Sequence, residues 1–106
     1  MAIEQRQSAR KILKVRAVLA MEGQTPVQGR TSDIGANGVS ITVPNPLQTG
    51  QTGQVGFDLL VDGTPYPLLA RVKVMYCIFS NGEFKAGLQF MNLDLTAMSQ
   101  VSRFLR

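Results

Sequence analysis

The 106-residue sequence contains no histidine and no tryptophan, and Cys77 is its one cysteine. Without histidine, catalysis by a histidine base or a histidine-containing triad is excluded. Zinc and other transition metals also lose their commonest ligand, so we expect no metal site and no cofactor. No close pair of carboxylates stands out either. The chain is therefore predicted to be a binding module and not an enzyme.

Long apolar runs and paired cysteines are missing as well. No stretch approaches the ~18 apolar residues of a transmembrane helix, and the polar N-terminus does not resemble a signal peptide. A single cysteine cannot form an internal disulfide, which indicates a reducing compartment. We therefore expect a cytoplasmic protein without membrane insertion. The length and the 44% hydrophobic content predict one domain over residues 1–106.

Basic charge is concentrated at the N-terminus. Residues 1–21 contain five basic residues and one acidic residue, which accounts for the whole net charge of +4. The rest of the chain holds equal numbers of the two signs. A local positive field of this kind favours an anionic partner. A solvated tail is the alternative that charge alone leaves open.

The hydrophobic pattern predicts six short antiparallel strands followed by one helix. Alternation of period two marks the strands at 13–21, 27–33, 38–43, 55–61, 68–76 and 84–90. Tight turns are predicted at 62–64 and 80–83, and a helix over 94–106 with Asp94 as its N-cap. Closing the sheet into a barrel over residues 12–92 removes exposed edges, and the helix can cover one opening. Residues 1–11 show no periodicity and are predicted to form a flexible arm.

The strand alternation also assigns faces. Along 68–76 it places Tyr76 inward with Val72 and Val74, so we interpret Tyr76 as a core residue and not as a stacking surface. The methionines at 75, 91 and 98 are interpreted as packing residues.

Two short motifs carry most of the functional information. The first, "RQSAR", is an R-x-x-x-R pattern formed by Arg6 and Arg10. The second, "SDIGANG" at 32–38, contains Asp33, Gly35 and Gly38 between two strands. Each is weak alone, because arginines four apart are common and glycines often serve only turns. For Gly38 by itself, turn geometry is the favoured interpretation.

Together and in this order, the two motifs resemble the PilZ domain family, which combines R-x-x-x-R with [D/N]-x-S-x-x-G. The stretch "AGLQFMNLD" at 86–94 resembles the closing strand of that family. The resemblance implies a six-stranded β-barrel with a C-terminal helix that binds cyclic di-GMP. It also implies that Arg6 and Arg10 clamp the ligand, that Asp33 and Gly38 read guanine, and that Gln5 influences ligand stacking. Gly35 stands where the family has serine, so we expect weakened binding that Gly35→Ser would tighten.

The chemistry of these residues suits a cyclic dinucleotide. A guanidinium is planar and permanently charged, and its fork of donors matches a phosphate or the O6/N7 edge of guanine. The Asp33 carboxylate can accept hydrogen bonds from guanine N–H groups. An arm can wrap over the ligand and become ordered on binding.

The sequence therefore predicts a cytoplasmic cyclic di-GMP receptor that signals to an unidentified effector protein by conformational change. Motility, biofilm formation and exopolysaccharide production are the outputs that the resemblance suggests. The alternative is a PilZ-type adaptor that binds no cyclic di-GMP and acts through protein–protein contacts. DNA or RNA binding is disfavoured, because the few aromatic residues lie mostly at inward positions and form no stacking surface.

Overall fold

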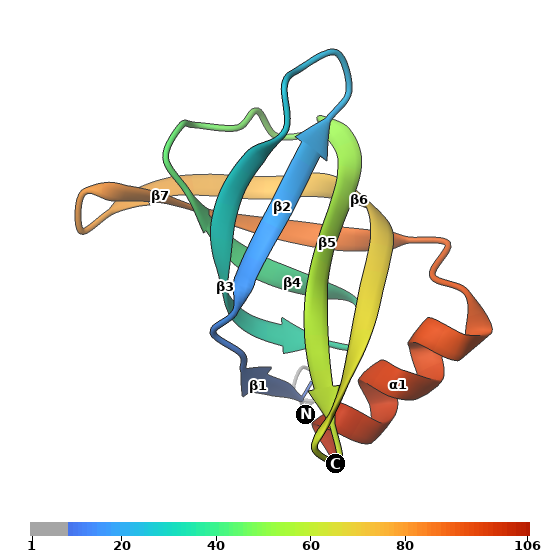
Figure 1. Ribbon diagram of the computed structural model, residues 1–106. Coiled ribbons are helices and arrows are strands. Elements are labelled where there is room, and N and C mark those ends of the chain that lie inside the picture. The colour runs from blue at the N-terminus through green and yellow to red at the C-terminus, as the bar shows by residue number, and fades with distance from the viewer. Residues whose placement is uncertain (1–8) are drawn as a thin grey trace, which may run out of the picture.

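Six antiparallel strands close on themselves to form a barrel, with one extra short strand and a C-terminal helix beside it (Figure 1). The computed structural model describes residues 9–106, so Gln5, Arg6 and most of the predicted arm lie outside the described residues. The elements are β1 (Arg10–Ile12), β2 (Arg16–Met21), β3 (Val27–Gly35), β4 (Gly38–Val43), β5 (Thr52–Val61), β6 (Thr64–Ser80), β7 (Glu83–Met91) and α1 (Leu95–Leu105). The predicted barrel and terminal helix are confirmed.

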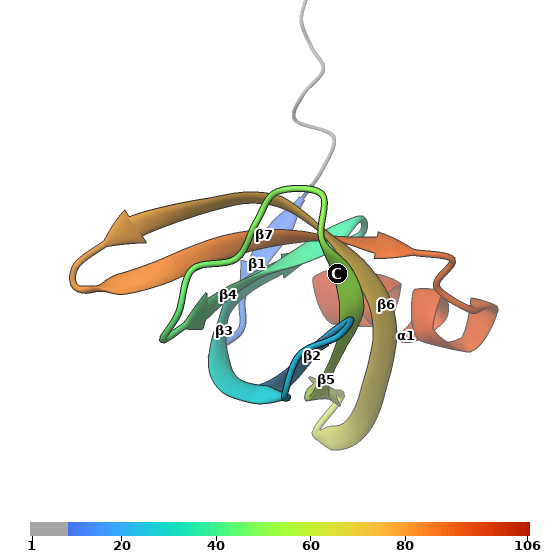
Figure 2. The same cartoon turned by 90° about the horizontal axis from the view of Figure 1, so that it is seen from above.

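The ring of strands runs β3–β2–β5–β6–β7–β4, and β4 closes it by pairing with β3. The extra strand β1 pairs with the end of β3 and continues the line of β2 along the same edge. Seen from above, the strands curve around a central core (Figure 2). Closure leaves little exposed sheet edge, which is the physical reason for a barrel at this chain length.

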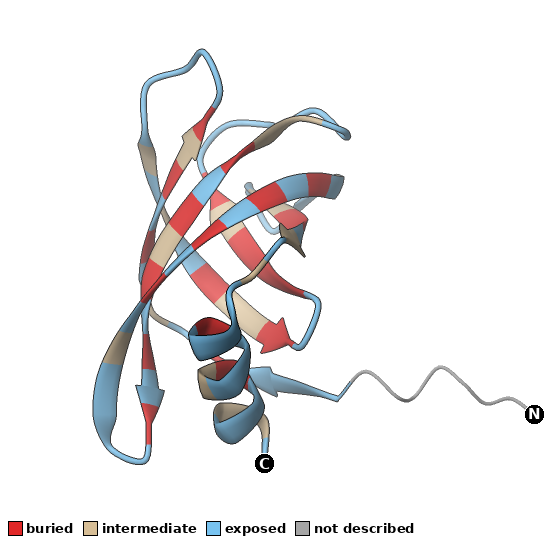
Figure 3. Ribbon diagram, turned by 90° about the vertical axis from the view of Figure 1, so that its right-hand side faces the viewer, coloured by how far each residue is buried: buried red, intermediate tan, exposed pale blue. Residues whose placement is uncertain are grey.

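Buried residues alternate with exposed ones along the strands (Figure 3). On β5 the predicted inward residues Val55, Phe57, Leu59 and Val61 are all buried. Helix α1 lies against β5 and buries Ala97 and Val101. Asp94 caps it as predicted, because its carboxylate accepts a hydrogen bond from the Ala97 N–H at 2.7 Å. No helix within residues 9–106 is long and apolar enough to cross a membrane.

The start of the chain differs from the prediction. Residues Arg10–Ile12 form a strand instead of irregular arm, and the chain bends at 13–15 before β2 begins. The buried Thr31 side chain holds this bend, since its hydroxyl donates to the Leu13 carbonyl and accepts from the Val15 N–H at 2.9 Å. A threonine within a strand pattern gives no sign of this use, so the bend could not be predicted.

The connection between β3 and β4 is shorter than predicted. Only Ala36 and Asn37 lie between the two strands, and Asp33 is part of β3. The turn interpretation of Gly38 is wrong, because its φ is not positive. Gly38 instead permits close packing of strands, since a Cβ there would overlap the carbonyl oxygen of Leu88 on β7.

The β6–β7 hairpin projects beyond the barrel (Figures 1 and 2). Positive φ values at Asn81 and Gly82 confirm the tight turn predicted there. A register shift between Val74 and Tyr76 reverses the alternation, so the prediction of a core Tyr76 is wrong and its side chain is exposed. The packing interpretation is also wrong for Met75 and Met98, which are both about half exposed.

Candidate ligand-binding site

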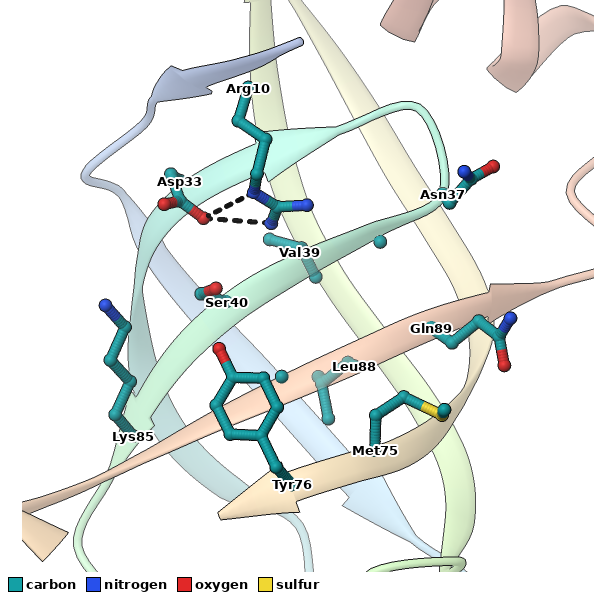
Figure 4. Close-up of a pocket in the computed structure, with 12 residues that line it drawn as sticks. Arg10, Asp33, Asn37, Val39, Ser40, Met75, Tyr76, Lys85, Leu88 and Gln89 are labelled. Atoms are coloured by element: carbon teal, nitrogen blue, oxygen red, sulfur yellow. Dashed lines mark hydrogen bonds and ion pairs between the residues drawn. The ribbon is translucent and has the colours of Figure 1, made fainter. Parts of the chain in front are cut away.

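A row of four residues crosses the outer face of the barrel on neighbouring strands. Asp33 on β3 pairs with Ser40 on β4, Ser40 pairs with Gly87 on β7, and Gly87 pairs with Tyr76 on β6. Neighbouring strands lie ~4.8 Å apart, so the row spans about 14 Å. These residues help to line a cavity of about 490 Å³, which falls in the ~300–1,000 Å³ range of small-molecule sites (Figure 4).

Two β-bulges set the ends of this row. The pairing of β3 with β4 shifts between Thr31 and Asp33, so Thr31 is buried while Asp33 lies in the outer cavity. The pairing of β6 with β7 shifts in the same way before Tyr76. A bulge inserts one extra residue and re-aims the side chains that follow it. Asp33 and Tyr76 therefore reach the same cavity through two independent irregularities.

Arg10 covers the Asp33 end of the cavity. Its Nε and Nη2 atoms donate to Asp33 Oδ1 at 3.2 and 2.9 Å (Figure 4). Arg10 lies directly opposite Gly35 in the β1–β3 pairing, and a Cβ at Gly35 would come within 2.9 Å of Arg10 Nη1. Because Gly35 has no side chain, the Arg10 side chain has room to extend along β3 to Asp33.

The next residue anchors β1 from its other side. The Lys11 ammonium donates to the carbonyls of Phe104 and Arg106 at 3.0 and 3.2 Å and lies over the Phe104 ring. A cation is favoured at a helix C-terminus because unpaired carbonyls and the helix dipole make that end negative. Alternation along β1 thus directs Arg10 to the cavity and Lys11 to α1.

The pKa of Asp33 lies below its ordinary value. Burial alone would raise the pKa, but hydrogen bonds from Arg10 and Ser40 and the charges of Arg10 and Lys85 outweigh burial. Asp33 is therefore an ionised hydrogen-bond acceptor at neutral pH. A carboxylate accepts through two oxygens, so it can bind a donor-rich ligand edge while it contacts Arg10.

Tyr76 forms the opposite wall. Its ring occupies the space where a side chain at Gly87 would lie, because a Cβ there would overlap three ring atoms. In Figure 4 its hydroxyl end points toward Ser40 across the cavity. The side chain is 43% exposed, so part of an aromatic surface remains available to a planar ligand group.

The cavity lining carries a small net positive charge. Its formally charged residues are Arg10, Asp33 and Lys85. Lys85 lies two residues from Gly87 on β7, and Figure 4 shows its side chain extending toward the Asp33 end. Asn37 and Gln89 add polar groups at the far side. The arrangement combines hydrogen-bond acceptors, cations and an aromatic face without a catalytic constellation among the described residues.

The structure brings together three of the six predicted site residues. Arg10, Asp33 and Gly38 line one cavity, although they come from separate motifs. Gly35 is not part of the lining and lies beneath Arg10. Arg6 and Gln5 fall outside the described residues.

Among the other lining residues, the sequence did not single out Ser40, Lys85 or Gly87 as site residues, and it assigned Tyr76 to the core. A glycine inside a strand pattern often marks a close approach of another group, so Gly87 carried a signal that was available. The bulges that expose Asp33 and Tyr76 leave no mark in the alternation and could not have been found.

Comparisons with known proteins agree with this fold. The family model for the PilZ domain matches residues 4–106. No curated protein matches the sequence. Solved structures that resemble the chain include the Bacillus subtilis inhibitor of motility MotI/DgrA, with a TM-score of 0.84 and 15% identity, covering 98% of this chain. This chain spans about half of that protein, 51% of its length.

Two further similar structures are complexes with cyclic di-GMP. The PilZ domain of Escherichia coli YcgR has a TM-score of 0.73 and 11% identity, with 96% of this chain and 89% of that chain covered. The PlzA protein of Borreliella burgdorferi has a TM-score of 0.64 and 13% identity, with coverage of 100% and 41%. Sequence identities this low show only that the fold is shared. The family model covers nearly the whole sequence, and the chain therefore belongs to the PilZ domain family.

Proposed function

We propose that this protein is a cyclic di-GMP receptor that binds its ligand in the cavity between β1, β3, β4 and the β6–β7 hairpin. The observation that carries the proposal is the meeting of two separated motifs. Arg10 of the R-x-x-x-R pattern contacts Asp33 of the second motif, and both line the cavity with Gly38. The similarity to two complexes with cyclic di-GMP supports the same ligand.

Each wall matches a part of the ligand. Asp33 is ionised and accepts hydrogen bonds, which suits the N1–H and N2–H donors of guanine. The exposed part of the Tyr76 ring offers a face on which a purine can stack. Arg10 presents further N–H donors to a phosphate or to the guanine O6/N7 edge. Arg6, four residues earlier in the chain, is assigned a ligand contact as well, because it shares the R-x-x-x-R pattern with Arg10.

The Arg10–Asp33 contact does not block the site. The two side chains are 40% and 32% exposed, and ion pairs in such surroundings contribute about 0–1 kcal/mol. A ligand that offers a phosphate to Arg10 and donors to Asp33 can replace this contact at small cost. The pair holds both groups near their binding positions beforehand.

Signalling to a protein partner is the second part of the proposal. Arg10 is part of β1, so a ligand that binds Arg10 also contacts β1. The next residue of β1, Lys11, contacts the C-terminal end of α1. A movement of β1 on ligand binding would therefore change the surface near the helix. Motility and exopolysaccharide control are candidate outputs, and the similar MotI/DgrA structure is that of an inhibitor of motility.

Calorimetric titration with cyclic di-GMP tests the receptor function. We expect saturable 1:1 or 2:1 binding by the wild type and a loss of about tenfold or more in Arg10→Ala, because charge-assisted hydrogen bonds are removed. The double variant Arg6→Ala/Arg10→Ala should bind more weakly still. Arg71→Ala is the matched control, since Arg71 is an exposed, ion-paired arginine on β6 that does not line the cavity.

Absence of binding heat up to roughly 100 μM ligand, with folded wild-type protein, would contradict the receptor function. That result would favour the adaptor that acts through protein contacts alone. Equal losses in Arg10→Ala and Arg71→Ala would mean that the ligand responds to charge in general and not to this cavity.

A further inference from the structure

We infer that Lys85 is a phosphate-binding residue of this site, although it belongs to neither motif. This inference rests on the proposed function, because the phosphate in question is that of cyclic di-GMP. Three features of Lys85 support it: its burial, its lack of an acidic partner among the described residues and its place in the cavity.

Lys85 is partly buried and forms no ion pair among the described residues. Lysine side chains on strands are ordinarily solvent-exposed, yet that of Lys85 is of intermediate burial on β7. Among the described residues, no carboxylate lies within ion-pairing distance of its ammonium group, whereas three arginines have such partners. The one acidic residue in the cavity lining is Asp33, and Arg10 already contacts it.

The charge balance of the cavity therefore depends on Lys85. The described lining holds two cations, Arg10 and Lys85, and one carboxylate, Asp33, which gives a net charge of +1. A partly buried cation outside an ion pair attracts an anion more strongly than a fully exposed one, because water screens it less. An anionic group of the ligand is the chemistry that fits this position.

The position of Lys85 suits a phosphate better than a base. Lys85 lies two residues from Gly87 along β7, about 6.7 Å away, on the face that carries Tyr76. A guanine that stacks on the Tyr76 ring, which covers Gly87, and turns its edge toward Asp33 lies over Ser40. The sugar–phosphate ring of the ligand must then lie beside this row of residues. Lys85 also lies beside the row (Figure 4). A lysine acts there as a point charge on the phosphate.

Calorimetric titration of Lys85→Met, Lys85→Arg and Lys14→Met with cyclic di-GMP tests the assignment. Methionine keeps the length and apolar stem of lysine without its charge. We expect about tenfold or greater loss of affinity in Lys85→Met and partial rescue in Lys85→Arg. Lys14→Met removes an exposed lysine outside the cavity lining and should bind like the wild type.

Salt and phosphorus NMR separate a phosphate contact from a structural role. Between about 50 mM and 300 mM salt, the wild type should lose more affinity than Lys85→Met, because screening weakens the contact that the variant lacks. One 31P resonance of the bound ligand should move toward its free position in Lys85→Met. Folding is checked by the melting temperature of each variant.

Two results would overturn the inference in distinguishable ways. If the wild type binds cyclic di-GMP and Lys85→Met matches Lys14→Met in affinity and 31P shifts, Lys85 does not contact phosphate while the receptor function stands. If the folded wild type does not bind cyclic di-GMP at all, the receptor function and the role of Lys85 fall together.

Discussion

The two glycines of the second motif act on different neighbours. Gly35 leaves room for the Arg10 side chain, and Gly38 leaves room for the Leu88 carbonyl on β7. Neither has a positive φ, so neither serves a turn that only glycine can form. The two glycines therefore serve close packing, whereas Asp33 and Asn37 are the residues of the motif whose side chains line the cavity.

A pair of variants at Gly35 isolates the missing serine hydroxyl. Gly35→Ala and Gly35→Ser add the same Cβ, which displaces the flexible end of Arg10 by the same amount. The hydroxyl is then the one difference, and a neutral hydrogen bond contributes about 0.5–1.5 kcal/mol. We expect Gly35→Ser to bind cyclic di-GMP about 2–10 times more tightly than Gly35→Ala in calorimetry. Equal affinities would contradict the role assigned to that hydroxyl.

The pKa of Asp33 gives a second prediction at this scale. Because its folded-state pKa lies below the unfolded value of about 3.9, its ionic contacts stabilise the fold fully above that pH. The stabilisation is lost as the pH falls through the lowered value. Carboxyl NMR titration should show the pKa of Asp33 rise in Arg10→Met, with Arg16→Met as the control. If the pKa of Asp33 stays unchanged in Arg10→Met, Arg10 is not a cause of its lowering.

At the scale of single elements, the alternation predicted some strands better than others. Strand β5 follows the alternation closely, and the helix with its Asp94 cap is where the pattern puts it. β1 could not be predicted, because three exposed residues carry no periodicity and their pairing depends on β3. On the long strand β6, alternation assigned Tyr76 to the wrong face, because alternation cannot reveal a bulge.

The β4–β7 pairing yields a stability prediction. In Gly38→Ala the added Cβ meets the Leu88 backbone, which cannot move without disturbing β7. We expect a loss of about 1–3 kcal/mol in the free energy of unfolding, seen as a melting temperature lower by at least about 4 °C. Gly56→Ala is the matched control, because its nearest neighbour, Leu69 Cδ1, is at an ordinary contact distance of 3.6 Å. A melting temperature of Gly38→Ala equal to that of Gly56→Ala would refute the close-packing role.

For the whole molecule, the barrel could be predicted because closure and burial follow from period-two alternation over most of the chain. The site could be predicted only in part. Arg10 and Asp33 were found as members of motifs. Ser40 and Lys85 became visible once the strand register placed Ser40 between Asp33 and Gly87, with Lys85 two residues from Gly87 on β7. Register depends on turns and bulges, and these depend on tertiary contacts such as that of Thr31 with the β1–β2 bend.

Ligand binding in the cavity is tested most directly by NMR mapping of cyclic di-GMP on the isotope-labelled protein. A receptor that uses this cavity should show saturable shift changes at Asp33, Gly38 and Tyr76, with nuclear Overhauser contacts between the Tyr76 ring and a guanine. A second basic depression, lined by Arg16 and Arg30, offers the competing location. Shift changes confined to that depression, or no saturable change anywhere in the folded protein, would contradict binding in the cavity.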